Sequence, residues 1–140
     1  MVVKTVVHFE IPANDVERQK QFYSECFGWK FQQAKIPGME YWMISTGPRN
    51  SSVGGGMYKK MAPNEMPRNY VNVGDIDSAI QTFRNAGGSE IMGKQEVPGM
   101  GWTFIGSDPE GNAVGIWQSV AKRPAARKSK KSGSKKAKRR

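Results

Sequence analysis

One pattern of predicted elements occurs twice along this chain and leaves few folds open to it. In each half, a short run of alternating apolar and polar side chains precedes an amphipathic segment, and three further strand-like runs follow. The runs lie at 6–11, 16–27, 29–34, 40–46 and 53–59 in the first half, and at 70–73, 76–86, 90–97, 102–106 and 113–118 in the second. Strands have a side-chain period of two and helices of 3.6, so each run indicates one element type. The order strand–helix–strand–strand–strand, found twice, predicts a repeated unit.

The ends of both predicted helices carry matching signals. Asp15 and Asp75 each precede an amphipathic segment, where a carboxylate can accept hydrogen bonds from the free amides of a first helical turn. Gly28 and Gly88 follow these segments, and glycine is common where a helix ends in a left-handed residue. A shift of 60 residues places Asp15 on Asp75 and Gly28 on Gly88, which supports two copies of one unit.

We therefore predict an α+β fold in which two βαβββ units, at about 4–60 and 68–118, form one cup-shaped mixed sheet within a single domain, 1–120. Both helices are expected to cover the apolar outer face of the sheet. Helical spacing predicts that Cys26, which is the single cysteine, lies on the buried face of the first helix and has a structural role.

Basic residues are concentrated at the end of the sequence. Of the 22 Lys and Arg residues, 11 lie in 121–140, which contains no acidic residue. Residues 1–120 then hold 11 basic and 12 acidic side chains, a net charge of −1, although the whole chain has a net charge of +10. The final segment also has no large apolar side chain, so we predict a disordered tail that binds nucleic acid or another polyanion without reading its sequence. The alternative is a solubilising extension.

No segment is typical of export or of a membrane span. The start of the chain has no apolar run of 7–15 residues after a basic stub, and no stretch approaches about 20 apolar residues. A single cysteine fits a reducing compartment. We predict a cytoplasmic protein without membrane association, to which the basic tail would add nucleoid association, or nuclear import in a eukaryotic source.

Strand alternation assigns polar and aromatic side chains to the concave face of the predicted sheet. If Val7 and Phe9 face the first helix, His8 and Glu10 face the cup, where two such groups can exchange a proton. The candidate catalytic residues are therefore His8 and Glu10. The candidate ligand-binding residues, for which the side of Trp102 stays open, are Arg68, Tyr70, Asn72, Trp102, Gly115 and Trp117. Mixed apolar and polar linings of this kind suit small organic ligands.

Several segments carry a family resemblance in the right order. They are HFEIPANDVERQKQFYSECFGWKF (8–31), YWMISTG (41–47), GGGM (54–57), NVGDIDSAI (72–80), VPGMGW (97–102) and DPEGNAVGIWQ (108–118). The chain resembles the vicinal-oxygen-chelate (VOC) superfamily, which includes glyoxalase I, bleomycin-resistance proteins and extradiol dioxygenases. Within it, the chain is most similar to a bacterial group of predicted enzymes related to lactoylglutathione lyase. The resemblance implies a homodimer.

The resemblance also implies where a metal would bind. The enzymes of the superfamily hold a divalent ion with four side chains, usually His, Glu, His and Glu. In this sequence the four positions fall on His8, within 54–56, near Arg68 and on Gly115, so only the first ligand is retained. One imidazole is too few for a catalytic metal site. We therefore predict no metal and no other cofactor, and we do not expect conventional metal-dependent glyoxalase I activity.

Three functions follow as hypotheses. The first is a glyoxalase-like domain that binds or transforms a small organic molecule, such as a carbonyl compound, with His8 and Glu10 as acid–base groups of a lyase or isomerase. The second is a ligand-sequestering protein of the resistance type, without catalysis. The third is a nucleic-acid-associated protein tethered by its basic tail. Whether the protein is an enzyme stays open at this point.

Overall fold

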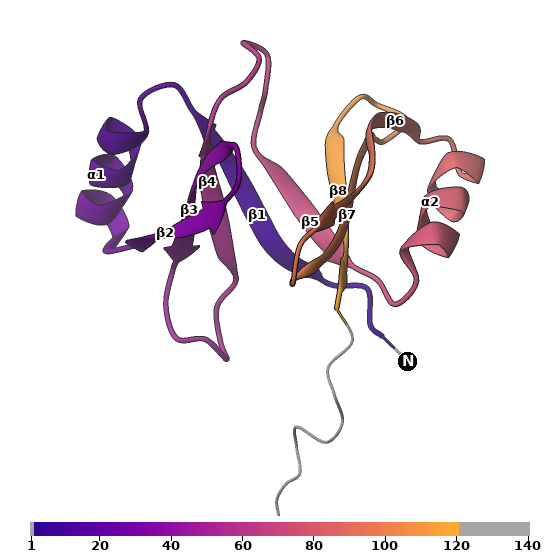
Figure 1. Ribbon diagram of the computed structural model, residues 1–140, viewed down its shortest axis with the longest axis horizontal. Coiled ribbons are helices and arrows are strands. Elements are labelled where there is room, and N and C mark those ends of the chain that lie inside the picture. The colour runs from indigo at the N-terminus through magenta and orange to yellow at the C-terminus, as the bar shows by residue number, and fades with distance from the viewer. Residues whose placement is uncertain (1, 121–140) are drawn as a thin grey trace, which may run out of the picture.

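The computed structural model describes residues 2–120, so the predicted tail, 121–140, lies outside the described residues. The described part contains ten elements in the predicted order (Figure 1). They are β1 (Val6–Ala13), α1 (Val16–Phe27), β2 (Lys30–Ile36), β3 (Met39–Ser45), β4 (Gly54–Lys59), β5 (Arg68–Asn72), α2 (Ile76–Asn85), β6 (Ser89–Val97), β7 (Gly101–Ser107) and β8 (Ala113–Ser119).

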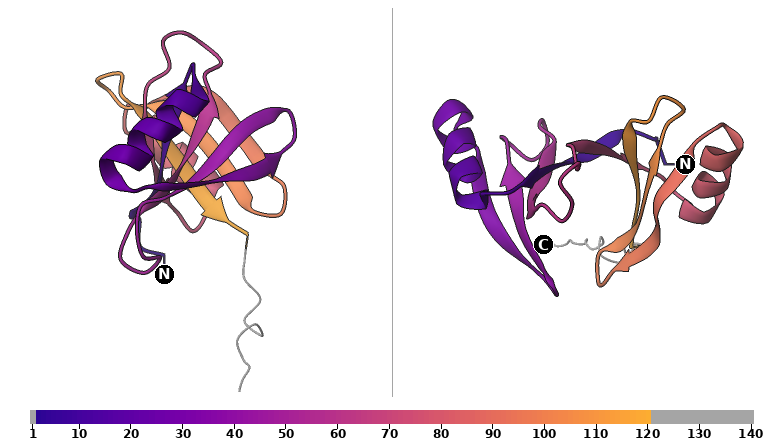
Figure 2. Two further views of the ribbon diagram at one scale, coloured as in Figure 1. Left: turned by 90° about the vertical axis from the view of Figure 1, so that its left-hand side faces the viewer. Right: turned by 90° about the horizontal axis from the view of Figure 1, so that it is seen from above.

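The eight strands form one mixed sheet in the order β2-β3-β4-β1-β5-β8-β7-β6. β1 pairs in parallel with β4, and β5 pairs in parallel with β8, while the other neighbours are antiparallel. Seen from above, the sheet curls into a half-barrel with both helices on its outer side (Figure 2). The predicted α+β fold with two βαβββ units is confirmed. In this sheet, the pairing of β1 with β5 joins the two units.

The N-terminal helix boundaries and the end of α1 agree with the predicted capping residues, whereas the C-cap of α2 is Ala86 and the following glycine with positive φ is Gly87, at 109°, rather than Gly88. Asp15 Oδ1 accepts a hydrogen bond from the Arg18 amide at 3.1 Å, and the Asp75 side chain accepts from the amides of residues 77 and 78. Gly28 takes the left-handed conformation, with φ of 71°, that ends α1 without a Cβ clash. Neither described helix is long and apolar enough to cross a membrane.

Each unit has its own hydrophobic core between its helix and the outer face of the sheet. The buried residues of the first core are Ile11, Ala13, Val16, Ile44 and Met57, with Trp29 and Trp42 packed against them. The buried residues of the second core are Val73, Ile76, Ile80, Phe104 and Ile116, with Trp102 packed against them. Because side chains alternate across a strand, these assignments leave the neighbouring positions for the concave face.

The last turn of α1 differs from the prediction. Cys26 is exposed, and Phe27 retains 62% of its accessible surface, although helical spacing places both on the buried face. Trp29, which follows the helix, stacks on Tyr23 at 5.0 Å between ring centroids. This indole occupies the side of the core that the last turn would otherwise cover, so the prediction for Cys26 is wrong.

Candidate functional site

Five hydrogen-bonded side chains lie on the concave face, where β1 meets β5, and we call them the Glu10 cluster. The Glu10 carboxylate accepts hydrogen bonds from the hydroxyls of Tyr41 at 2.8 Å and Tyr70 at 2.7 Å. Arg68 Nη2 forms an ion pair with Glu10 at 2.9 Å, and Arg68 Nε donates to Tyr70 Oη at 3.1 Å. His8 Nε2 lies 2.8 Å from Tyr41 Oη. The cluster thus connects the predicted pair His8 and Glu10 through a tyrosine.

Strand register brings these side chains together from both units. β1 and β5 pair so that Glu10 is opposite Arg68 and His8 is opposite Tyr70. Tyr41 comes from β3, on the other side of β4. The side chains of Glu10 and Arg68 each retain 12% of their accessible surface, and both tyrosines are buried. An ion pair so far removed from water is tolerated because further hydrogen bonds satisfy its atoms.

Burial and charge set the protonation states in the cluster. Burial lowers the pKa of His8, while the nearby Glu10 carboxylate raises it to a smaller extent, so the imidazole is neutral at neutral pH. Burial, followed by Glu10, raises the pKa of Tyr41 and of Tyr70 well above the ordinary value. Both phenols therefore keep their protons and act as hydrogen-bond donors.

Two glycines occupy positions where the family resemblance places metal ligands, and tyrosine side chains fill the space beside them. A Cβ atom added to Gly56 would lie 1.8 Å from Tyr41 Oη, and one added to Gly115 would lie 2.4 Å from the Tyr70 ring. Contacts below 3.0 Å essentially never occur for real Cβ atoms. No side chain larger than hydrogen fits at either position while the tyrosines stay in place.

The residues present do not fit a divalent metal. Of the four ligand positions only His8 has a metal-binding side chain, and the position near β5 holds the guanidinium of Arg68, which repels cations. Glu10, the remaining carboxylate of the cluster, is already paired with Arg68. Within residues 2–120, no group of three or more His, Cys, Asp or Glu side chains is placed to hold a metal ion.

We expect the purified protein to contain far less than one metal ion per chain, because its donor set supplies a single imidazole. The measurement is inductively coupled plasma mass spectrometry of full-length protein expressed with Fe, Zn, Ni and Mn in the medium. Near-stoichiometric amounts of any of these metals after gel filtration would contradict the prediction.

The second half of the cup adds an amide and an indole. Asn72 on β5 is opposite Trp117 on β8, which is in turn opposite Thr103 on β7. Trp117 alternates with Ile116, which belongs to the core under α2, and so lies on the concave face. Its ring lies over Gly101, where an added Cβ would come within 2.9 Å of it, and its Nε1 donates to Ser119 Oγ at 3.0 Å.

The structure decides the side of Trp102, which the sequence left open, and it shows what the Arg68 side chain contacts. Trp102 shares its side of β7 with Phe104 and packs against the core under α2, with Lys94 Nζ 4.6 Å from its ring centroid. It therefore lies on the outer side of the sheet. Arg68 is on the concave side, but its guanidinium contacts Glu10 and Tyr70, so its charge is already neutralised within the protein.

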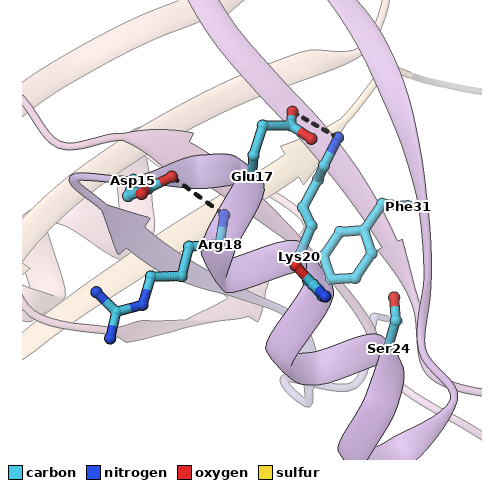
Figure 3. Close-up of a pocket in the computed structure, with 7 residues that line it drawn as sticks. Asp15, Glu17, Arg18, Lys20, Ser24 and Phe31 are labelled. Atoms are coloured by element: carbon cyan, nitrogen blue, oxygen red, sulfur yellow. Dashed lines mark hydrogen bonds and ion pairs between the residues drawn. The ribbon is translucent and has the colours of Figure 1, made fainter.

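Two surface hollows lie outside the cup, one beside each helix. The hollow beside α1 is lined by Asp15, Glu17, Arg18, Lys20, Gln21, Ser24 and Phe31 (Figure 3). Its charged groups have local roles, because Asp15 caps the helix and Lys20 pairs with Glu17 at 3.0 Å. The hollow beside α2 is similar, with Lys94 paired to Asp77 at 2.9 Å. Neither contains a residue that the sequence singled out for chemistry.

Sequence reasoning missed Tyr41, which links His8 to Glu10. Alternation within 40–46 places Tyr41 and Met43 on one face and Trp42 on the other, but it does not say which face is concave. Gly56 was a usable signal. A glycine at a position where the resemblance places a metal ligand leaves room for a large side chain from the neighbouring strand β3. Tyr58 on β4 was missed as well; its ring lies 5.3 Å from the Arg68 guanidinium.

Comparisons with known proteins agree with this geometry. Residues 5–47 match the family described as "Bleomycin resistance protein-like N-terminal". A "Glyoxylase-like domain-containing protein" of Didymella fabae is 36% identical in an alignment of 89 positions that covers 59% of this chain and 67% of that protein. The chain belongs to the glyoxalase/bleomycin resistance protein/dioxygenase superfamily. A solved member of this superfamily from Vibrio splendidus shares the fold, with a TM-score of 0.60 and 14% identity over 84% of this chain and all of that one.

A second relative shows how much of a longer superfamily protein this chain corresponds to. "Putative glyoxylase CFP32" of Mycobacterium bovis is 26% identical in an alignment of 129 positions that covers 79% of this chain. The chain spans 44% of the length of that protein. Membership in the superfamily thus rests on sequence and fold together, while activity and substrate are matters for proposal.

Proposed function

We propose that the concave face of the sheet binds a small organic molecule without a metal ion. The observation that carries this proposal is that the Glu10 cluster fills the part of the concave face where the family resemblance places the metal ligands. The cluster keeps the cup polar at the seam of the two units, and its charge is internally neutralised by the pairing of Glu10 with Arg68. Asn72 and Trp117 supply an amide and a flat apolar surface in the second half, as ligand sites commonly do.

The same geometry favours acid–base catalysis as a second candidate function. His8, Tyr41 and Glu10 form a continuous chain of hydrogen bonds, each 2.8 Å long. A neutral imidazole at the end of such a chain is suited to take a proton from a bound carbonyl compound. Simple sequestration needs no such chain.

Turnover of methylglyoxal with glutathione, with and without added Ni or Zn, tests the conventional metal-dependent reaction, for which we expect no activity.

Trp117 provides a direct test of ligand binding in the cup. Among the four tryptophans, Trp29, Trp42 and Trp102 pack against the two outer cores, and Trp117 alone lies on the concave face. A ligand in the cup should therefore quench the fluorescence of Trp117 and leave the other three unchanged. We expect Trp117→Phe to abolish the quenching by an active member of a metabolite panel and to weaken its binding about tenfold, equal to about 1.4 kcal/mol.

The matched control for this experiment is Trp102→Phe, which makes the same exchange on the outer side of the sheet. This variant should keep both the quenching and the affinity measured by isothermal titration calorimetry. Loss of quenching in Trp102→Phe but not in Trp117→Phe would place the ligand outside the cup and contradict the proposed function.

The basic segment supports a separate proposal, that residues 121–140 tether the protein to nucleic acid. Residues 1–120 have a net charge of −1 and offer no general attraction for phosphate. The full chain should bind duplex DNA with a strong salt dependence, up to a slope of about −10 if all 11 basic side chains reach phosphates. A chain truncated to 1–120 should be released from a DNA column at low salt. Equal retention of both chains would refute tethering.

A further inference from the structure

Hydrogen-bond directions in the Glu10 cluster are fixed by a count of its protons. The arginine half of the cluster shows the rule. A guanidinium carries donors and no acceptor, so Arg68 Nε must donate to Tyr70 Oη at 3.1 Å. Tyr70 has one hydroxyl proton, and it goes to Glu10 Oε1 at 2.7 Å. The direction of this chain is therefore Arg68 to Tyr70 to Glu10.

The histidine half has the same form but ends in a group that could point either way. Glu10 forms an ion pair with Arg68 at 2.9 Å, and the carboxylate of such a pair only accepts hydrogen bonds. The single proton of the Tyr41 hydroxyl is thus given to Glu10 Oε2 at 2.8 Å. Tyr41 Oη is left with lone pairs only. His8 Nε2, 2.8 Å away, must supply the proton of the remaining hydrogen bond.

We infer that the Glu10 cluster fixes His8 as the Nε2–H tautomer, so that Nδ1 carries a lone pair and accepts a hydrogen bond from the bound ligand. This deepens the proposed function and rests on it for the presence of a ligand. Within residues 2–120, Nδ1 has no hydrogen-bond partner from the protein. Tyr41 and Glu10 act here as positioning residues, because they set the direction of the imidazole without contacting the ligand.

The neighbours of the His8 ring, the Tyr70 ring and Gly54, are compatible with the Nε2–H tautomer. The ring meets Tyr70 edge to face, with centroids 5.7 Å apart and an interplanar angle of 71°, and Gly54 lies opposite it on β4. The charged members of the cluster are Glu10 and Arg68, which form an ion pair at 2.9 Å. Because Arg68 is paired with Glu10, the cluster has no unpaired cation to attract an anion into the cup.

These features select a class of ligand. A molecule that donates an O–H or N–H, or that has a weakly acidic C–H, is matched to Nδ1. A carboxylate or phosphate brings only acceptors and finds no unpaired cation in the cluster. We therefore expect a neutral ligand with a hydrogen-bond donor.

Nuclear magnetic resonance can read the tautomer directly, because the protein has one histidine. Full-length protein is labelled with ¹⁵N-histidine, and long-range ¹H–¹⁵N correlations are recorded at pH 7.5 without ligand. The expected spectrum has a protonated Nε2 and an unprotonated Nδ1. A spectrum with the proton on Nδ1 would overturn the inference. Since no ligand is present, this result is independent of the proposed function.

Two single-hydroxyl variants show whether the cluster is responsible. Tyr41→Phe removes the acceptor for Nε2–H and should give a mixture of both tautomers. Tyr70→Phe removes the equivalent hydroxyl on the arginine side and should leave the His8 spectrum unchanged. A Tyr41→Phe spectrum identical to that of the native protein would show that the tautomer is set elsewhere and would overturn the inference.

The ligand class is tested with phenol and anisole, which differ mainly in the hydroxyl donor. Phenol should move the ¹⁵N shift of Nδ1 toward the value of a hydrogen-bonded nitrogen, and anisole at the same concentration should not. Quenching of Trp117 by phenol without a shift at Nδ1 would refute the acceptor role but leave binding in the cup intact. Failure of the whole metabolite panel to quench Trp117, with the expected tautomer present, would refute the proposed function alone.

Discussion

Replacing Glu10 by glutamine should lower the free energy of unfolding by about 3 kcal/mol or more, because the change leaves a buried arginine without its counter-charge. Arg68 retains 12% of its side-chain accessibility and has its ion pair with Glu10 at 2.9 Å. Both tyrosine hydroxyls also lose the carboxylate that accepts their protons. Urea denaturation at pH 7.5, followed by tryptophan fluorescence, measures the loss.

The control for this variant is Glu17→Gln on α1. Glu17 also pairs with a basic residue, Lys20 at 3.0 Å, but its side chain is 75% exposed. An exposed helical pair contributes about 0.3–0.5 kcal/mol, so this variant should be close to the native protein. If both glutamine variants lost the same small amount, the Glu10 cluster would not stabilise the fold as its burial indicates. The double variant Glu10→Leu with Arg68→Met should lose less than Glu10→Gln alone, since it leaves no orphan charge.

The second large effect is expected from Gly56→Ala, which introduces a single methyl group into a filled space. The new Cβ would lie 1.8 Å from Tyr41 Oη, so Tyr41 must move and give up its hydrogen bonds to His8 and Glu10. Overpacking of this kind costs about 1–3 kcal/mol, and the lost hydrogen bonds add about 1 kcal/mol each. The measurement is again the free energy of unfolding in urea.

Two further variants separate this clash from a general effect of alanine. Gly47→Ala adds the same methyl group in an exposed loop, where its nearest contact is 3.4 Å, and should be nearly neutral. Tyr41→Ala combined with Gly56→Ala should be less destabilised than the sum of the two single changes, because the side chain that clashes is gone. Additive losses would show that Tyr41 does not fill the space beside Gly56.

The fold could be predicted from the sequence because its signals are local and repeated. Asp15 and Asp75 cap their helices as expected, and Gly28 ends α1 in the left-handed conformation. The strand boundaries differ from the predicted ones by at most two residues. Where the prediction was wrong, as for Cys26, the cause is tertiary: Trp29 folds back onto Tyr23 and takes the place of the last turn.

The site could be predicted only in part, because it depends on contacts between distant strands. Alternation placed His8 and Glu10 on one face, and the structure brings both into the Glu10 cluster. The role of Tyr41 as their link depends on the register of β3 on β4 and on the missing side chain at Gly56, whose place Tyr41 fills, and neither can be read from one strand alone. For Trp102 the sequence left the side open, and the buried Phe104 two residues later decides it.

The position of the Glu10 cluster at the seam of the two units has a consequence for how the protein unfolds. Each unit has a separate core, and β1 and β5 join them. The ion pair between Glu10 and Arg68 and the hydrogen bond from Tyr70 to Glu10 cross that junction. The candidate site therefore also holds together two units that could otherwise unfold separately. Substitutions in the Glu10 cluster that change ligand specificity would therefore also weaken the coupling between the two units. Such variants would lose two-state unfolding of the domain.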